Sequence, residues 1–452
     1  MANFSKSQVP QFSVEVYQNE FLPEGGREVS AIVTVSSTGG GTSGGAPLTG
    51  ASASPAAIPG GSAGAAVVIM VDCSGSMDYP PTKMRNAREA TAAAIDTLRD
   101  GVEFAVVDGT HVAREVYPGG GRLAVADRRT REQAKDSLRR LTAGGGTAIG
   151  TWLRLADRLL ASSDSPIRHG ILLTDGRNEH ESPEDLRAAL TAVAGRFTCD
   201  ARGVGTDWEV KEVTGIASAL LGTADIVADP SQLAADFTSM MENAMGKEVA
   251  DVALRLWTPL GAEIRFVKQV APTVEELTHR RTEAGPRAGD YPTGSWGDES
   301  RDYHVSVRVP EAGIGQEMLA ARVSLIIPAA DGGAPEVLSQ GLIRAVWTDD
   351  MAASTSINPQ VAHYTGQAEL ADVIQEGLDA RKSGDFDGAT AKLGRAVQLA
   401  EASGNEDTAK LLSKVVDVVD AATGTVRLKA KVADADEMTL ETRSTKTVRV
   451  KK

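Results

Sequence analysis

The chain is poor in cysteine and in long apolar segments. Its 452 residues include only two cysteines, Cys73 and Cys199, which excludes a disulfide framework and suits a reducing compartment. The apolar run at 65–71 has 7 residues, whereas a membrane-spanning helix needs about 20. The opening residues, MANFSKSQVPQFSVEV, contain no apolar core of a signal peptide. We therefore expect a cytoplasmic protein without a membrane span.

The chain also lacks an excess of positive charge. Its 47 lysines and arginines face 61 aspartates and glutamates, giving a formal net charge of −14. Nucleic acids and anionic membrane surfaces bind clusters of basic side chains. We therefore expect neither as a partner. The length predicts several domains rather than one.

Charge is missing altogether from residues 37–64, which consist largely of Gly, Ala, Ser, Thr and Pro. Such a composition cannot bury a core, so we predict a flexible linker. Residues 41–45 match the G-x-S-x-G pattern of a hydrolase nucleophile elbow. An elbow needs a strand before it and a helix after it, and neither is predicted here. We attribute the match to chance.

Residues 65–246 alternate between apolar strands and amphipathic helices, which predicts an α/β domain with a doubly wound, mostly parallel, Rossmann-like sheet. A helix is expected over 83–99, where apolar residues recur with helical spacing. Asp108-Gly109 is a hairpin signal, so one antiparallel edge strand is expected. The predicted strands are 66–71, 103–107, 168–174, 198–204 and 224–228.

From 247 to 350 the apolar residues recur with a period of two, which predicts a β-sandwich. The same period is found in residues 10–36, and an isolated pair of strands would be only marginally stable. We predict that the N-terminal strands of residues 1–36 join this β-sandwich. The α/β domain would then be inserted into it.

Residues 351–423 show helical periodicity and predict a helical hairpin or bundle, with a third helix over 406–421. Residues 424–452 are predicted to form a basic tail rich in Ser and Thr. Its candidate phosphorylation sites are Thr442, Thr445 and Thr447, because basic side chains flank them. A solvated tail or an edge strand is the alternative.

Polar side chains follow the predicted strands at their carboxyl ends, which meet at one rim of the sheet. Asp72, Ser74 and Ser76 form a D-x-S-x-S pattern, Thr147 follows three glycines, and Asp175 ends another strand. Two carboxylates and three hydroxyls, without His or Cys, suit Mg²⁺, with Mn²⁺ or Ca²⁺ as alternatives. Because the hydroxyls are neutral, the cation would keep an open position for a carboxylate of another molecule.

The stretches DCSGSM, GGGTAIG and LLTDGRNE resemble the three loops of the metal-ion-dependent adhesion site of von Willebrand factor A (VWA) domains. The resemblance covers about residues 65–246 and includes RGVGTDW at 202–208. It implies a metal site that binds an acidic residue of a partner protein. Its ligands would be Asp72, Ser74, Ser76, Thr147 and Asp175. The domain order and YPTGSWGDESRDYHV at 291–305 resemble bacterial, actinobacterial-type intracellular VWA proteins.

These motifs have other possible interpretations. The D-x-S-x-S pattern alone could be a turn that caps the next helix. Ser74 as a nucleophile would need a base, and no histidine has a recognisable triad spacing. The glycines before Thr147 are not followed by the lysine of a phosphate loop. We therefore expect no enzyme activity. Residues 178–181 could rim the metal face, but we interpret them as a solvated approach to a helix.

The sequence thus predicts a Mg²⁺-dependent protein-binding or scaffolding protein. One alternative is an adaptor for an ATPase of the AAA+ type, which would act in trans because the chain has no phosphate loop. The other is a component of a signalling cluster regulated through its tail. A Ser/Thr kinase and a forkhead-associated protein would then be partners.

Overall fold

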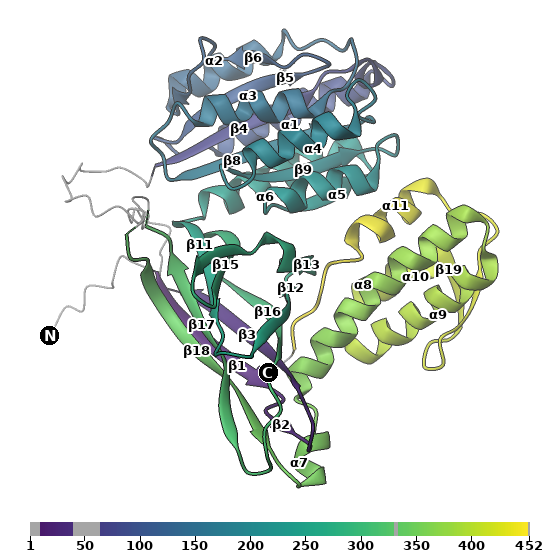
Figure 1. Cartoon of the computed structure of the whole chain (residues 1–452). Coiled ribbons are helices and arrows are strands. Elements are labelled where there is room, and N and C mark those ends of the chain that lie inside the picture. Colours follow the sequence, from purple (N-terminus) through teal and green to yellow (C-terminus); the bar gives the residue numbers. More distant parts are fainter. Residues whose placement is uncertain (1–9, 39–63, 330–332, 451–452) are drawn as a thin grey trace, which may run out of the picture. The chain divides into compact units, whose positions relative to one another are not determined.

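The computed structural model describes residues 10–38, 64–329 and 333–450, which form two compact units (Figure 1). The described residues of the first unit are 10, 64–251 and 294–298, and those of the second are 11–38, 252–293, 299–329 and 333–450. No helix among the described residues is long and apolar enough to cross a membrane. Most of the predicted linker, 37–64, falls outside the described residues.

The first unit is built on a sheet with the strand order β10-β9-β8-β4-β5-β6, and β7 also pairs with β5. Its parallel strands are β4 (Ala65–Asp72), β5 (Glu103–Gly109), β8 (Ile167–Thr174), β9 (Thr198–Val204) and β10 (Ala224–Val227). The antiparallel strands are β6 (Arg114–Tyr117) and β7 (Ala124–Val125). The predicted α/β fold with a mostly parallel sheet is confirmed.

Helices cover both faces of this sheet. Alternate residues of β4, such as Val67 and Ile69, share one apolar cluster with α1, α2 and α6. By contrast, α3 contacts β4 and β5, and α5 contacts β9 and β10. The helices are α1 (Thr82–Thr97), α2 (Arg128–Leu138), α3 (Ile149–Leu160), α4 (Pro183–Val193), α5 (Val210–Ala219) and α6 (Leu233–Met245), with short turns η1 (Gly75–Asp78) and η2 (Pro230–Gln232). The sheet is therefore doubly wound.

Two further sheets are antiparallel, apart from β2, which runs parallel to β18. One sheet has the order β1-β3-β16-β12-β13, with β1 (Gln11–Gln18), β3 (Glu28–Thr38), β16 (Glu299–Arg308), β12 (Glu263–Ala271) and β13 (Glu275–Glu276). The other has the order β14-β15-β11-β17-β18-β2, with β14 (Thr282–Gly285), β15 (Ala288–Trp296), β11 (Val249–Trp257), β17 (Glu317–Ile327), β18 (Glu336–Trp347) and β2 (Phe21–Leu22). A short turn, η3 (Thr278–Arg280), follows β13.

Strands from the two ends of the sequence pair directly. β3 lies between β1 and β16, with Val35 opposite Val14 on one side and opposite Arg301 on the other. Side chains of β1 also reach the second sheet, since a Cβ on Gly341 of β18 would lie 2.7 Å from Val16. The chain therefore leaves this pair of sheets after β3 and returns to it later.

The C-terminal region is helical up to Val415. α8 begins after Asn358, whose side chain accepts a hydrogen bond from the backbone N–H of Gln360, and ends at Gly384 with a φ of 85°. α9 ends in the same way at Gly404, with a φ of 66°. The helices are α7 (Met351–Thr355), α8 (Pro359–Ser383), α9 (Phe386–Ser403) and α10 (Glu406–Val415). The predicted C-terminal helical region is confirmed.

The predicted third helix over 406–421 is wrong beyond Val415. A hairpin of β19 (Val416–Asp420) and β20 (Thr425–Leu428) follows instead. Three valines within four residues favour a strand over a helix. Gly424, with a φ of 70°, allows the tight turn.

The basic tail predicted for 424–452 is corrected as well, because residues Asp434–Arg443 form α11. Thr442 is only 4% exposed, so this fold does not present its hydroxyl to a kinase. Thr445 and Thr447 are half-buried. The Thr447 hydroxyl donates a hydrogen bond of 2.7 Å to the carbonyl of Val270. The segment after α11 is packed rather than free.

His304 is a buried titratable group in the middle of β16. It is 6% exposed, its Nε2 has no hydrogen-bond partner among the described residues, and its ring packs edge-on against Phe266. Burial and the nearby charge of Lys268 lower the pKa of His304 to about 4. The folded protein therefore keeps this histidine neutral in mildly acidic solution.

We expect His304 to weaken the fold as the pH falls from 7.5 to 5.0. An unfolded histidine takes up a proton near pH 6.5, whereas folded His304 does so only near pH 4. Stability is therefore lost as the pH drops through this window, by about 2 kcal/mol at pH 5.0. Urea unfolding at both pH values should show this extra loss in the wild type and not in His304→Phe. His279→Phe, at an exposed position, is the control and should lose stability as the wild type does. An equal pH dependence of wild type and His304→Phe would contradict the expectation.

Candidate metal centre

The site begins where the buried strand β4 ends in a carboxylate. Every residue of β4 is buried, and Asp72 has no exposed surface. Asp72 Oδ1 accepts a hydrogen bond of 2.8 Å from the N–H of Ser74, and Oδ2 accepts one of 2.7 Å from the Thr174 hydroxyl. Burial and the neighbouring charge of Asp175 raise the pKa of Asp72 to about 6, although the bonds from Ser74 and Thr174 oppose this shift. The strand end thus holds a fully desolvated carboxyl group.

The loop after β4 is held by backbone hydrogen bonds to two other loops. The N–H of Cys73 donates to the carbonyl of Gly109, and that of Gly75 donates to the carbonyl of Gly145. The N–H of Gly144 returns a bond of 2.8 Å to the carbonyl of Cys73. The Cys73 side chain lies in the apolar cluster that includes residues of α1. The Ser74 side chain, by contrast, makes no capping hydrogen bond to η1. The capping alternative is therefore excluded for Ser74.

The two serines of this loop are linked to the end of β8. Ser74 Oγ and Ser76 Oγ are 2.9 Å apart, and Ser76 Oγ donates a bond of 2.7 Å to Asp175 Oδ1. Asp175 is fully buried, directly after Thr174 at the end of β8. Three of the predicted site residues are thus joined in one chain of contacts.

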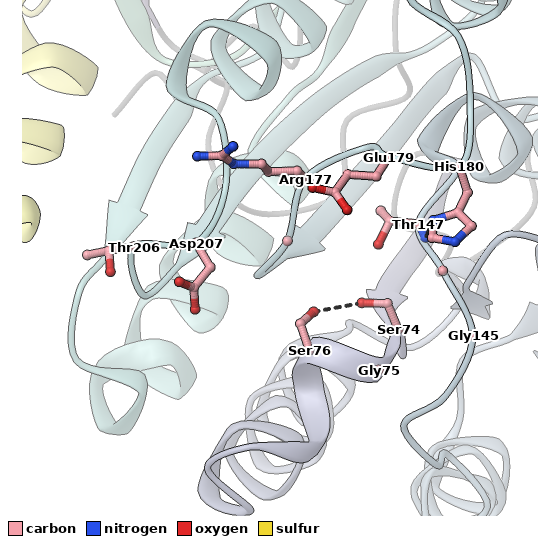
Figure 2. Close-up of a pocket in the computed structure, with 12 residues that line it drawn as sticks. Ser74, Gly75, Ser76, Gly145, Thr147, Arg177, Glu179, His180, Thr206 and Asp207 are labelled. Atoms are coloured by element: carbon pink, nitrogen blue, oxygen red, sulfur yellow. Dashed lines mark hydrogen bonds between the residues drawn. The ribbon is translucent and has the colours of Figure 1, made fainter. Parts of the chain in front are cut away.

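The surroundings of Gly176 show that the hydroxyl of Thr147 lies close to the hydroxyls of Ser74 and Ser76. A Cβ on Gly176 would lie 3.1 Å from Ser76 Oγ, 3.7 Å from Thr147 Oγ1 and 3.9 Å from Ser74 Oγ. The hydroxyls therefore surround one small volume, which stays open because residue 176 is glycine. This volume is part of a pocket of about 420 Å³ (Figure 2). The pocket is lined by Ser74, Gly75, Ser76, Gly145, Gly146, Thr147, Gly176, Arg177, Glu179, His180, Thr206 and Asp207.

The segment 178–181 does more than approach a helix through solvent, so that interpretation is corrected. Asn178 Oδ1 accepts a bond of 2.7 Å from the N–H of Ile149, and Glu181 Oε2 accepts one of 2.9 Å from that of Gly150. These side chains satisfy free N–H groups in the first turn of α3. They hold the loop after β8 against the helix that follows Thr147. Trp152 of α3 is fully buried.

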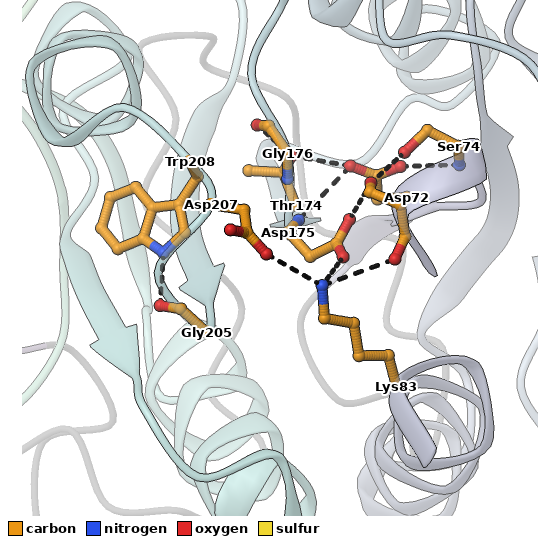
Figure 3. Close-up of polar contacts among 10 residues, drawn as sticks. Asp72, Ser74, Lys83, Thr174, Asp175, Gly176, Gly205, Asp207 and Trp208 are labelled. Atoms are coloured by element: carbon orange, nitrogen blue, oxygen red, sulfur yellow. Dashed lines mark hydrogen bonds and ion pairs between the residues drawn. The ribbon is translucent and has the colours of Figure 1, made fainter. Parts of the chain in front are cut away.

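Sequence reasoning missed two residues of the site, Thr174 and Lys83. The hydroxyl of Thr174 bonds Asp72 from the last position of β8. Lys83, in the first turn of α1, places its Nζ 2.7 Å from Asp175 Oδ2 and 3.3 Å from Asp207 Oδ2 (Figure 3). No local sequence pattern signals Lys83, because its contact with Asp175 joins residues 92 positions apart. Asp207 lies in the stretch RGVGTDW, which sequence reasoning matched to the family without assigning it a role.

The donor set fits a hard divalent cation. Oxygen ligands at 2.0–2.1 Å in octahedral positions lie about 2.9 Å from their neighbours, and the contact between the two serine hydroxyls has this length. The described residues contain no cluster of three or more His, Cys, Asp or Glu that could hold a metal. Hydroxyl and carboxylate oxygens favour Mg²⁺, Ca²⁺ or Mn²⁺ over metals that prefer nitrogen or sulfur. The site can therefore hold such an ion mainly through neutral oxygens.

Comparisons with known proteins identify the family of the chain. Residues 65–226 match the model of the von Willebrand factor type A domain, and residues 398–444 match that of the von Willebrand factor type A C-terminal domain. A solved von Willebrand factor type A protein from Catenulispora acidiphila is 54% identical, with 99% of each chain covered and a TM-score of 0.89. The chain therefore belongs to the von Willebrand factor type A family. This relative is actinobacterial, in line with the predicted resemblance.

A more distant structure shares the fold. The ArnB paralog VWA2 from Sulfolobus acidocaldarius is 16% identical over 96% of this chain and 98% of its own, with a TM-score of 0.55. Proximal thread matrix protein 1 from the mussel byssus has been solved with a zinc-occupied MIDAS motif. It is 23% identical over 40% of this chain and 46% of its own, with a TM-score of 0.34. No curated protein sequence matches the chain. VWA domains are in general protein-interaction modules.

We expect Gly176→Ala to weaken Mg²⁺ binding roughly 10–100-fold without disturbing the fold. The new methyl group would fill the volume among the three hydroxyls, and the backbone at this position is not left-handed. Isothermal titration calorimetry would measure the affinity, and circular dichroism would check the fold. Gly144→Ala is the matched control, because a Cβ there meets nothing within 4 Å. Equal Mg²⁺ affinities for the two variants would contradict the expectation.

Proposed function

We propose that the chain is a Mg²⁺-dependent protein-binding or scaffolding protein whose metal site captures an acidic residue of a partner. The observation that carries this proposal is the convergence of three hydroxyls around Gly176, with the carboxylates of Asp72 and Asp175 beside them. Mn²⁺ or Ca²⁺ would suit the same oxygen donors.

The roles of the residues follow from their contacts. Ser74, Ser76 and Thr147 supply hydroxyl oxygens, and Asp72 and Asp175 supply the negative charge, in part through water. When bound, the ion would supply a positive centre for a carboxylate from outside. The chain's own part is to fix these oxygens and to limit water at the floor of the pocket, where Ser74 and Thr147 are 2% and 4% exposed.

The composition and the site together favour a binding role over an enzymatic one. Neither serine hydroxyl of the loop contacts a histidine among the described residues, and the Ser74 hydroxyl is engaged with Ser76. A nucleophilic mechanism would need a base at that position. The net charge of −14 disfavours nucleic acid and anionic membranes. We also propose a cytoplasmic location, in keeping with the free, buried thiols of Cys73 and Cys199.

The two alternative roles have less support. An adaptor for an AAA+ ATPase stays a prediction, since no contact among the described residues bears on it. Regulation by a Ser/Thr kinase and a forkhead-associated protein is disfavoured at Thr442, which is buried. Thr445 and Thr447 are only half-buried, so regulation by phosphorylation of these residues stays a prediction.

Asp72→Asn should abolish capture of the partner at pH 7.5. The substitution keeps the shape of the side chain but removes a buried negative charge that the ion requires. A pull-down from lysate of the native host, with Mg²⁺ or with EDTA, would compare wild type and variant. Proteins retained by the wild type in Mg²⁺ and lost both in EDTA and with Asp72→Asn are the expected result. Asp157→Asn, on the far end of α3, is the control. Retention that neither EDTA nor Asp72→Asn reduces would refute the proposal.

A further inference from the structure

Lys83 places a positive charge against the candidate metal ligands. Its side chain is 8% exposed, and its Nζ donates hydrogen bonds to Asp175 Oδ2 at 2.7 Å, Asp207 Oδ2 at 3.3 Å and the Ser76 carbonyl at 3.4 Å (Figure 3). Burial disfavours a charge, but two carboxylates accept hydrogen bonds from this Nζ. The ammonium group is therefore charged at neutral pH.

Asp175 accepts hydrogen bonds both from Lys83 and from the hydroxyl cluster, which consists of Ser74, Ser76 and Thr147. Asp175 Oδ1 accepts the bond from Ser76, whereas Oδ2 accepts the bond from Lys83. Buried lysines are rare unless they are paired. Asp207 is 70% exposed, so solvent screens most of its charge. The buried partner of Lys83 is thus Asp175.

The charge of Lys83 opposes metal binding. Asp72 and Asp175 are both fully buried, and together they carry a formal charge of −2 when ionised. Lys83 reduces this charge to −1 in the absence of a metal. A divalent cation entering the site meets this smaller attraction and a fixed ammonium group nearby. Removal of Lys83 should therefore tighten metal binding.

The same charge favours an acidic ligand on the metal. With a divalent ion bound, the two carboxylates, Lys83 and the ion carry a formal charge of +1, which one carboxylate neutralises. Without Lys83 the ion already balances Asp72 and Asp175, and an added carboxylate would leave an uncompensated negative charge in a poorly solvated site.

We propose that Lys83 determines the ligand preference of the metal centre, by lowering its affinity for the ion and raising the affinity of the loaded site for a carboxylate. This inference rests on the proposed function and extends it to one residue outside the hydroxyl cluster. Lys83 thereby makes metal and acidic ligand bind cooperatively.

The test compares Mn²⁺ binding to the full chain by isothermal titration calorimetry at pH 7.5. Each titration is made in sodium chloride and in sodium acetate of equal ionic strength, with acetate as the probe carboxylate. Lys83→Met should bind Mn²⁺ about tenfold tighter than wild type in chloride, because a neighbouring like charge is removed. Acetate should tighten Mn²⁺ binding by the wild type, through the reciprocal coupling of the two ligands, and not by Lys83→Met.

The controls separate charge from packing. Lys83→Arg keeps the charge and should retain the acetate effect. Lys135→Met removes a lysine of α2 that pairs with Asp96 and should match the wild type. If circular dichroism shows that Lys83→Met does not fold, Lys83→Gln takes its place with the same expectations.

Two results would overturn the inference. One is Mn²⁺ binding by Lys83→Met that is no tighter than that of the wild type, and the other is an equal acetate effect in both proteins. Asp72→Asn distinguishes this failure from that of the proposed function. If Asp72→Asn loses Mn²⁺ binding and Lys83→Met gains none, only the role of Lys83 fails. If wild type and Asp72→Asn bind equally, the site itself is wrong and the inference falls with it.

Discussion

The complete burial of the Asp72 carboxylate is the constraint on which the arrangement of the site depends. A carboxyl group without solvent must find its hydrogen-bond partners in the protein. Here they come from the backbone of its own loop at Ser74 and from the end of the neighbouring strand at Thr174. These two bonds tie the loop after β4 to the end of β8. The bonds to Gly144 and Gly145 then bring in the third loop.

Under the proposed function, a site made in this way is preorganised for its ion before the ion binds. The serine hydroxyls already stand 2.9 Å apart, so little reorganisation would be needed to bring them into one coordination shell. Preorganisation of this kind increases affinity without adding contacts. The donors are mostly neutral, and Lys83 offsets part of the negative charge. On the proposed function, such a donor set favours binding of a second, external ligand over maximal affinity for the metal.

Much of the fold and the site could be predicted from the sequence, because strand ends are local signals. The apolar runs mark each parallel strand, and the topology then brings Asp72, Thr147 and Asp175 to one rim. Lys83 was missed because its contact with Asp175 joins residues 92 positions apart and no local pattern records it. The capping of α3 by Asn178 and Glu181 was missed for the same reason. The hairpin after α10 was missed because helical periodicity continues into a valine-rich strand.

The pairing of β3 with β16 has a consequence for the synthesis of the chain. Val33 of β3 lies opposite Tyr303 of β16, so a ribosome completes the first strand long before its neighbour exists. At a synthesis rate of roughly 5–20 residues per second, β1 and β3 exist for tens of seconds before β16 is made. The α/β unit, whose strands are made consecutively, can fold during that interval. The strands β4 to β10 of the α/β unit are thus complete before β16, the partner of β3, is synthesised.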